Sequence, residues 1–272
     1  MKALFVRIDR SPLLSQLIPL SLTLVVFIIF VALLHAVLLL FNRIPQAEYV
    51  RLTPRWYDIA VGATIYLKTS IDFAIFMGRL MASNPGWRNR IAIEIGTAAG
   101  NTIGTIAIIG LWVVFKNVEL LLAGMVFIAS LVLFELANGS LEHIKNRKLR
   151  KPLHWFLRVV TRFTPKIGID LSSRKNLPWW GLLGFSMSVP FILGLDDFAG
   201  YVPLFTVVNV YGFAIGVIGA HTLLNIALFL SPRRTIEAVR NEIVSFLGAL
   251  AFIGLGIYGL VETVRILFEV FT

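Results

Sequence analysis

The sequence predicts an all-α, polytopic membrane protein with about seven transmembrane helices, arranged as one extra helix followed by two three-helix repeats of opposite orientation. The 272 residues are 57% hydrophobic and only 15% charged, and the mean hydropathy is +0.83. Apolar runs long enough to span a bilayer, about 20 residues each, recur along the chain. Basic residues collect in the connections between these runs, as is typical of membrane proteins.

The first predicted membrane helix is the apolar run from about Leu13 to Phe41, which follows a short basic segment. A cleaved signal peptide has an apolar core of about 7 to 15 residues, so this longer run predicts a retained helix. His35 lies inside the helix and is expected to pack rather than to bind a ligand. Pro45 and Pro54 predict a loop, which completes an N-terminal unit over 1–55.

A first three-helix unit is predicted over 56–138. Its helices are expected at Trp56–Ala82, Arg90–Phe115 and Val118–Ala137. Polar residues recur every three to four positions along the second helix and therefore share one face. They are Glu94, Thr97, Asn101 and Thr105. A second stripe, at a spacing of four, consists of Gly96, Gly100 and Gly104, and such a stripe lets a neighbouring helix approach closely.

The longest polar segment, 139–177, separates this unit from the next. Ten of the 25 Lys and Arg residues lie in it, between Lys145 and Lys175. Basic and aromatic residues mix between His154 and Phe163, a composition typical of a short helix on the membrane surface. The segment is therefore predicted to be a cytoplasmic linker.

A second three-helix unit is predicted over 178–272. Its helices are expected at Trp179–Thr206, Val210–Leu230 and Val244–Phe268. The first of them contains Pro190 and Pro203, which have no N–H group to donate. The carbonyl groups of Ser186 and Ala199 thus lose their helical partners and are candidate cation ligands.

The distribution of basic residues predicts the orientation. Alternate connections place 19 Lys and Arg residues on one side of the bilayer and five on the other. Because cytoplasmic connections are rich in Lys and Arg, the N-terminus and the linker are expected in the cytoplasm and the protein in the plasma (inner) membrane. Units of three helices then enter the membrane from opposite sides, which makes the second unit an inverted repeat of the first.

Acidic residues recur at matching places in the two units. The sequence Asp72-Phe73-Ala74 recurs as Asp197-Phe198-Ala199 about 125 residues later. An asparagine lies in the next predicted helix of each unit, Asn101 in the first and Asn225 in the second. A charged side chain at mid-bilayer costs at least about 2.5 kcal/mol, so such residues usually pair or line an ion path. Adjacent helical residues point about 100° apart, so only one of Asp196 and Asp197 can face the axis that relates the two units. The match to Asp72-Phe73-Ala74 favours Asp197.

These residues make up the predicted substrate site. Its members are Asp72, Asp197, Asn101, Asn225, Glu94, His221 and Asp196. Carboxylate, amide and carbonyl oxygens are hard ligands that suit Na⁺, Mg²⁺, Ca²⁺ or Mn²⁺, and Asp72 and Asp197 are the expected metal ligands. His221 and Glu94 add proton acceptors.

Structural roles are the alternative for each of these residues. Ion pairs would explain two of the acids, through Lys68 with Asp72 and Arg79 with Glu94. Exposure near the outer surface would make the Asp196-Asp197 pair ordinary solvated residues. Hydrogen bonding between helices would explain His221 and Asn225.

Two three-helix inverted repeats, each with an acid in its first helix and an asparagine in its second, resemble the lysine exporter (LysE) superfamily. The resemblance covers roughly Trp56 to Phe268, without identifying a branch. It implies export of a cation or metal ion, with Asp72 and Asp197 lining the substrate path. The Glu-x-Gly-Asp-Lys signature of the calcium/manganese exchanger branch is absent, and the N-terminal helix and the basic linker are additions to the pattern.

The predicted function is secondary transport, by export, of a small cation coupled to protons, because proton and cation would compete for the same carboxylates. A passive ion channel is one alternative, and a transporter of an amino acid or of a lipid-like amphiphile is another. The chain has no HExxH, GxSxG or P-loop motif, so an enzyme is not expected.

Composition also limits cofactors and partners. The chain has no cysteine, which excludes disulfides and thiolate metal centres. No resident cofactor is expected beyond the transported cation. Nucleic acid is not expected as a partner, because the basic residues lie in short connections. The expected partners are the lipid bilayer, the small cation or other small substrate, and a second copy in a homodimer.

Overall fold

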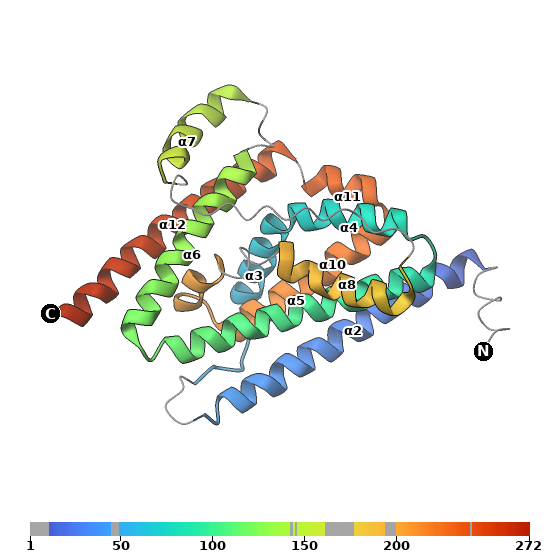
Figure 1. Ribbon diagram of the computed structural model, residues 1–272, viewed down its shortest axis with the longest axis horizontal. Coiled ribbons are helices and arrows are strands. Elements are labelled where there is room, and N and C mark those ends of the chain that lie inside the picture. The colour runs from blue at the N-terminus through green and yellow to red at the C-terminus, as the bar shows by residue number, and fades with distance from the viewer. Residues whose placement is uncertain are drawn as a thin grey trace.

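The computed structural model describes residues 11–44, 49–141, 144, 146–160, 177–193, 200–239 and 241–272. Every regular element in that part of the chain is a helix, which confirms the all-α class (Figure 1). The elements are α2 (Pro12–Phe41), α3 (Trp56–Thr69), α4 (Ile71–Ser83), α5 (Trp87–Phe115), α6 (Glu119–Leu141), α7 (Arg147–Val160), α8 (Trp179–Leu193), the 3₁₀ helix η2 (Val202–Thr206), α10 (Val210–Leu230), α11 (Pro232–Val239) and α12 (Glu242–Phe271).

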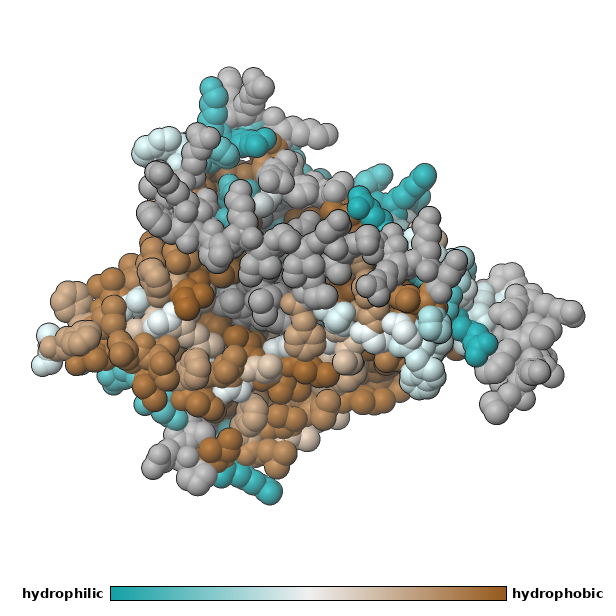
Figure 2. Space-filling view, in the orientation of Figure 1, coloured by the Kyte–Doolittle hydropathy of each residue, from teal (hydrophilic) through white to brown (hydrophobic). Residues whose placement is uncertain are grey.

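Several of these helices have the length and composition of membrane spans. Five helices among the described residues qualify by themselves: α2, α5, α6, α10 and α12. The bent pair α3 and α4 adds a sixth if it is counted as one span, whereas α8 has only 15 residues. Apolar side chains are exposed on the long helices, as at Ile28 of α2 (64%) and Val261 of α12 (62%). Figure 2 shows apolar atoms covering much of the face formed by α2, α5, α6 and α12. The chain therefore fits a multi-pass membrane protein.

The predicted second helix, Trp56–Ala82, is broken. The chain bends by 66° between α3 and α4, at Ser70, whose ψ is 23°. The backbone N–H of Ser70 and the hydroxyl of Thr69 both donate to the carbonyl of Tyr66, at 2.9 and 3.1 Å. A hydroxyl that competes for a helical carbonyl in this way favours the end of a helix. Lys68 and Asp72, which the sequence predicts within one continuous helix, consequently lie on different helices, so that prediction is wrong.

Other boundaries differ less. The sixth predicted helix coincides with α10, and the third, fourth and seventh begin or end within about four residues of α5, α6 and α12. The predicted surface helix begins earlier than expected, as α7. It packs on α6, where Phe156 lies edge to face against Phe134, and it leaves Trp155 74% exposed. Helix α11, which begins at Pro232 directly after α10, was not expected from the sequence. The predicted fifth helix is described as α8 and η2, with 194–199 outside the described residues.

Three helix pairs make up the core of the molecule. Helix α3 packs on α10, α5 packs on α8, and α6 packs on α12 (Figure 1). Helix α2 lies across α5 and α10. On α10 it is tied by His35, whose Nδ1 lies 3.2 Å from the hydroxyl of Tyr211. His35 thus packs between helices, as expected.

Glycine allows two of these pairs to touch through their backbones. A Cβ atom on Gly216 of α10 would overlap the carbonyl oxygen of Ile59 on α3, and one on Gly62 would overlap that of Phe213. In the other pair, a Cβ atom on Gly100 of α5 would overlap the carbonyl oxygen of Met187 on α8. The close packing predicted from the glycine stripe is therefore confirmed at this contact, because any larger residue would push the helices apart.

Adding one methyl group at such a contact should destabilise the fold. Gly216→Ala places a carbon against the Ile59 carbonyl, and overpacking of this kind costs about 1–3 kcal/mol. Gly124→Ala on α6 is the matched control, because a Cβ atom there meets nothing within 4 Å. Thermal unfolding in detergent should give a lower midpoint for Gly216→Ala only. Equal midpoints for the two variants would contradict the contact.

Candidate functional site

A chain of polar side chains lies buried between α2, α3, α5 and α10. Its members are Thr23, Tyr66, Glu94, Thr97, His221 and Asn225, each less than 7% exposed. Four different helices supply them, and the apolar core surrounds them. Buried polar groups need hydrogen-bond partners, so the partners of each residue indicate what the arrangement can do chemically.

His221 of α10 is at one end of this chain. The hydroxyl of Tyr66 on α3 lies 2.5 Å from its Nδ1, and Nδ2 of Asn225 lies 3.0 Å from its Nε2. A neutral imidazole offers one N–H donor and one acceptor nitrogen. If the Asn225 amide donates to Nε2, then Nδ1–H donates to the Tyr66 oxygen, and both ring nitrogens are satisfied. The ring also packs against Phe73 of α4, with centroids 5.3 Å apart.

Asn225 connects the buried polar side chains of α10 with those of α5. Its Nδ2 lies 3.4 Å from Oγ1 of Thr97 and donates to it. The Thr97 hydroxyl in turn donates to the backbone carbonyl of Ile93 at 2.9 Å, and it lies 3.2 Å from the carbonyl of Glu94. The predicted polar face of α5 therefore points inward. The hydrogen bond between Asn225 and Thr97 joins the two three-helix units of the protein.

Glu94 is at the other end, and its hydrogen bonds can accommodate either a charged or a protonated carboxyl group. Oγ1 of Thr23 lies 2.7 Å from Oε2 of Glu94 and 2.9 Å from the backbone carbonyl of Pro19. A hydroxyl has one proton and cannot donate fully to both oxygens. If Glu94 is protonated, it donates to Thr23, and Thr23 donates to Pro19. In the described part of the chain, Oε1 of Glu94 has no partner, and Arg79, the pairing alternative, is exposed.

Asn101 lies one helical turn beyond Thr97 and is also buried, at 3% exposed. Its Nδ2 has no partner among the described residues, and neither does the hydroxyl of Ser186 on α8. An unsatisfied buried polar group costs about 1–3 kcal/mol, so its presence calls for an explanation such as a ligand. Gly100, next to Asn101, contacts Met187 and Pro190 of α8. Polar atoms without partners among the described residues therefore lie on both helices of the pair α5 and α8.

The predicted acids are placed only in part. Asp72 lies in the first turn of α4, directly after the bend, but its side chain is outside the described residues, as are Asp196 and Asp197 entirely. A meeting of Asp72 with Asp197 stays a prediction. Within the described ranges, no group of three or more His, Asp or Glu side chains could hold a metal ion.

Sequence reasoning missed two members of the buried chain, Tyr66 and Thr23. Each is a single polar residue in an apolar helix, without the periodic repetition that marks α5. Only the packing of α3 on α10 and of α2 on α5 identifies their partners. The available signal was weak, namely a hydroxyl group deep within a predicted membrane span.

Comparison with known proteins places the chain in no family. No family model, no curated protein and no solved structure matches it. The resemblance to the LysE superfamily therefore stays a prediction. The function has to be argued from the residues and their geometry.

Removing the Tyr66 hydroxyl should destabilise the protein without changing its shape. Tyr66→Phe leaves Nδ1 of His221 buried without its partner, a loss of about 1–3 kcal/mol. Tyr258→Phe is the matched control, because in the described part of the chain its hydroxyl makes one long contact, 3.4 Å to the hydroxyl of half-buried Thr206. Thermal unfolding of the two variants checks this, and an unchanged midpoint for Tyr66→Phe would show that the hydrogen bond contributes nothing.

Proposed function

We propose that this protein is a proton-coupled secondary transporter that exports a small cation across the plasma membrane, with its path between two inverted three-helix repeats. The observation that carries the proposal is the buried Glu94 carboxyl group, which shares the Thr23 hydroxyl with a backbone carbonyl and keeps one oxygen without a partner. Such a group fits a residue that holds a proton in one state and a cation in another.

Helix pairing supports the inverted repeat. The proposed first repeat comprises α3 with α4, then α5 and α6, and the second comprises α8 with η2, then α10 and α12. A two-fold operation between them exchanges α3 with α8, α5 with α10, and α6 with α12. It converts the pair of α3 and α10 into the pair of α8 and α5, and it maps the pair of α6 and α12 onto itself. These are the three pairs that pack.

The glycine contacts favour a particular register for the repeat. Gly216 faces the Ile59 carbonyl, and Gly96 faces the Leu183 carbonyl. If these contacts are equivalent, α10 follows α5 by 120 residues, whereas α8 follows α3 by 124. Asn101 then corresponds to His221 rather than to Asn225, one helical turn from the match made by sequence.

This register gives the two halves of the path different tasks. Both ring nitrogens of His221 are in hydrogen bonds, whereas the amide nitrogen of its counterpart Asn101 is unpartnered in the described part of the chain. In one half this position is therefore satisfied by its own side chains, although Oδ1 of the neighbouring Asn225 has no partner among the described residues. The other keeps polar atoms free for a ligand or water.

Proton and cation would compete at the carboxyl groups. Loss of the proton from Glu94 leaves an anion inside the bundle, which Arg90, one turn away on α5, stabilises in part and which a cation that replaces the proton would stabilise further. Carboxylate and amide oxygens suit a hard cation. Asp72 lies directly after the bend between α3 and α4, and Asp197 lies between α8 and η2, so both are proposed to complete the site.

The proposed topology has seven spans and a cytoplasmic N-terminus. Because the chain lacks cysteine, single cysteines can be introduced at Asn117, in the connection after α5, and at Lys151 of α7. An impermeant thiol reagent added to intact cells should label Asn117→Cys, and Lys151→Cys only after permeabilisation, because 19 of the basic residues lie on the side of α7. The reverse pattern would invert the topology.

Transport itself is tested in liposomes. Flux of Na⁺, Mg²⁺, Ca²⁺ and Mn²⁺ should depend on a pH gradient, and Asp72→Asn and Asp197→Asn should each abolish it, while Asp196→Asn should be milder. Glu94→Gln keeps a donor for Thr23 and should fold normally, yet transport with little or no response to pH, because an amide cannot release a proton.

Two outcomes would contradict the proposal. Cation flux through the wild type that ignores the pH gradient would favour a passive channel. Absence of cation flux, together with flux of amino acids or of amphiphiles, would favour those substrates instead. The thermal unfolding midpoint of each variant separates a loss of transport from a loss of folding.

A further inference from the structure

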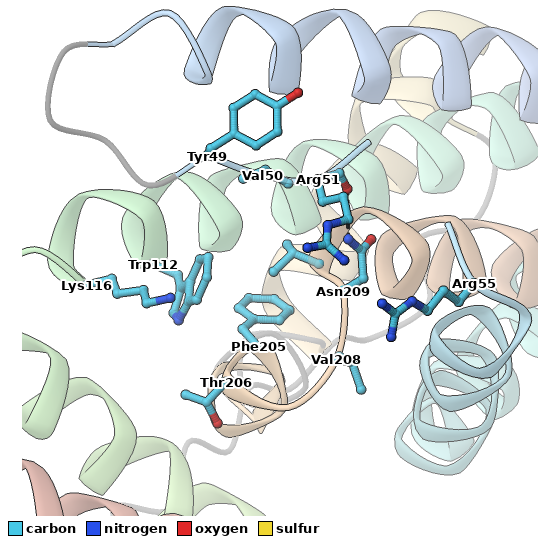
Figure 3. Close-up of a pocket in the computed structure, with 11 residues that line it drawn as sticks. Tyr49, Val50, Arg51, Arg55, Trp112, Lys116, Phe205, Thr206, Val208 and Asn209 are labelled. Atoms are coloured by element: carbon cyan, nitrogen blue, oxygen red, sulfur yellow. Dashed lines mark hydrogen bonds between the residues drawn. The ribbon is translucent and has the colours of Figure 1, made fainter. Parts of the chain in front are cut away.

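A cavity of about 280 Å³ opens at one boundary of the helix bundle and shares none of its lining residues with the buried polar chain at Glu94 (Figure 3). It is formed where three spans meet the same boundary, namely the start of α3, the end of α5 and the start of α10. The residues that matter for its chemistry are Arg51, Arg55, Lys116, Trp112, Phe205 and Asn209. Its size is close to the lower end of about 300–1,000 Å³ for small-ligand sites.

The lining of the cavity is strongly basic. Arg51, Arg55 and Lys116 line it, and none of its lining residues is acidic. On the proposed topology this side of the membrane carries only five basic residues, and three of them gather here. Among the described residues, neither guanidinium takes part in an ion pair. Positive charge concentrated in a concave site, on a side that otherwise avoids it, indicates an anionic ligand.

Two asparagine side chains fix the segment that carries the arginines. Asn42 accepts from the backbone N–H of Val50 at 2.7 Å and donates to its carbonyl at 2.9 Å. Asn209 donates to the carbonyl of Arg51 at 2.8 Å (Figure 3). The backbone is thus held without any use of the guanidinium groups. They are left available for a ligand in a preorganised site, which reduces the entropy lost on binding.

The start of α10 adds to the attraction for anions. Asn209 caps this helix through its side-chain oxygen, which accepts from the N–H of Gly212 at 2.8 Å. The positive end of the helix dipole therefore faces the side of the cavity. Buried Asp58 accepts from the N–H of Asn209 at 3.0 Å and is not among the lining residues.

The other wall is aromatic. Trp112 and Phe205 pack edge to face with centroids 5.7 Å apart, and Nζ of Lys116 lies 4.7 Å from the centre of the Trp112 ring. In Figure 3 these side chains lie on one side of Arg51 and Asn209, with Arg55 on the other. An aromatic wall beside basic groups suits a ligand with a charged head and an apolar body.

We propose that this cavity binds a phosphate group attached to a small apolar body, such as the headgroup of a phospholipid or a soluble phosphate ester. The planar guanidinium of arginine matches phosphate oxygens in two parallel hydrogen bonds. The ends of three membrane spans surround the cavity, which is where lipid phosphates lie. A bound phosphate would connect segments of both proposed repeats with the loop that follows α2.

The experiment uses the purified full chain in detergent and measures binding by calorimetry. The probes are inorganic phosphate, glycerol 3-phosphate, dihexanoylphosphatidylglycerol and, as the uncharged comparison, dihexanoylglycerol. The test variant is Arg51→Gln combined with Arg55→Gln, which leaves the backbone bond from Asn209 intact. The control is Arg43→Gln, an exposed arginine of the same connection that does not line the cavity.

We expect the wild type and Arg43→Gln to bind dihexanoylphosphatidylglycerol equally, and the double variant to bind it about tenfold more weakly or worse, because hydrogen bonds to charged groups are lost. Binding of that probe alone identifies a lipid headgroup as the source of the phosphate, whereas equal binding of glycerol 3-phosphate identifies a soluble ester. The proposal is overturned by the absence of binding to the wild type, by equal binding of dihexanoylglycerol, or by equal affinity of the double variant and Arg43→Gln.

Discussion

Two contacts in which a backbone carbonyl occupies the place of a missing side chain hold the rest of this structure in position. Gly216 meets Ile59 in one and Gly100 meets Met187 in the other, and both bring a pair of helices to backbone distance. In a surrounding that is as apolar as the helices themselves, burial of apolar surface does not drive association. Close van der Waals packing at small residues does, so these contacts determine which helices are neighbours.

The buried polar chain follows from that choice of neighbours. The Tyr66 hydroxyl reaches His221 only because α3 lies against α10, and Thr97 reaches Asn225 because α5 lies beside the same helix. Polar groups in such a core are stable only when they have hydrogen-bond partners, and most polar atoms of these buried side chains have one. The exceptions among the described residues are Oε1 of Glu94, Oδ1 of Asn225 and, one turn beyond Thr97, Nδ2 of Asn101. The proposed function places a proton, a cation or water at these atoms.

The two boundaries of the bundle differ in the same physical terms. On the proposed topology, one carries most of the basic residues in the connections between helices, where their charge acts on the orientation of the chain. The other has few basic residues, and most of these face a cavity whose backbone is fixed by Asn42 and Asn209. The basic residues of the first boundary are spread over several connections, whereas those of the second boundary lie together on a fixed backbone. A binding site that is preorganised in this way loses less entropy when its ligand binds.

The sequence by itself determined the helical class, the extent of α10, the inward polar face of α5 and the need for close packing at Gly96 and Gly100, because composition and local periodicity encode these features. Tertiary structure decided the bend at Ser70, the start of α11, the partners of His221 and the clustering of Arg51 with Lys116. Hydrogen bonds such as Tyr66 to His221 join residues 155 positions apart. Local periodicity carries no information about such a distance in sequence, since the partner is fixed only when whole helices pack.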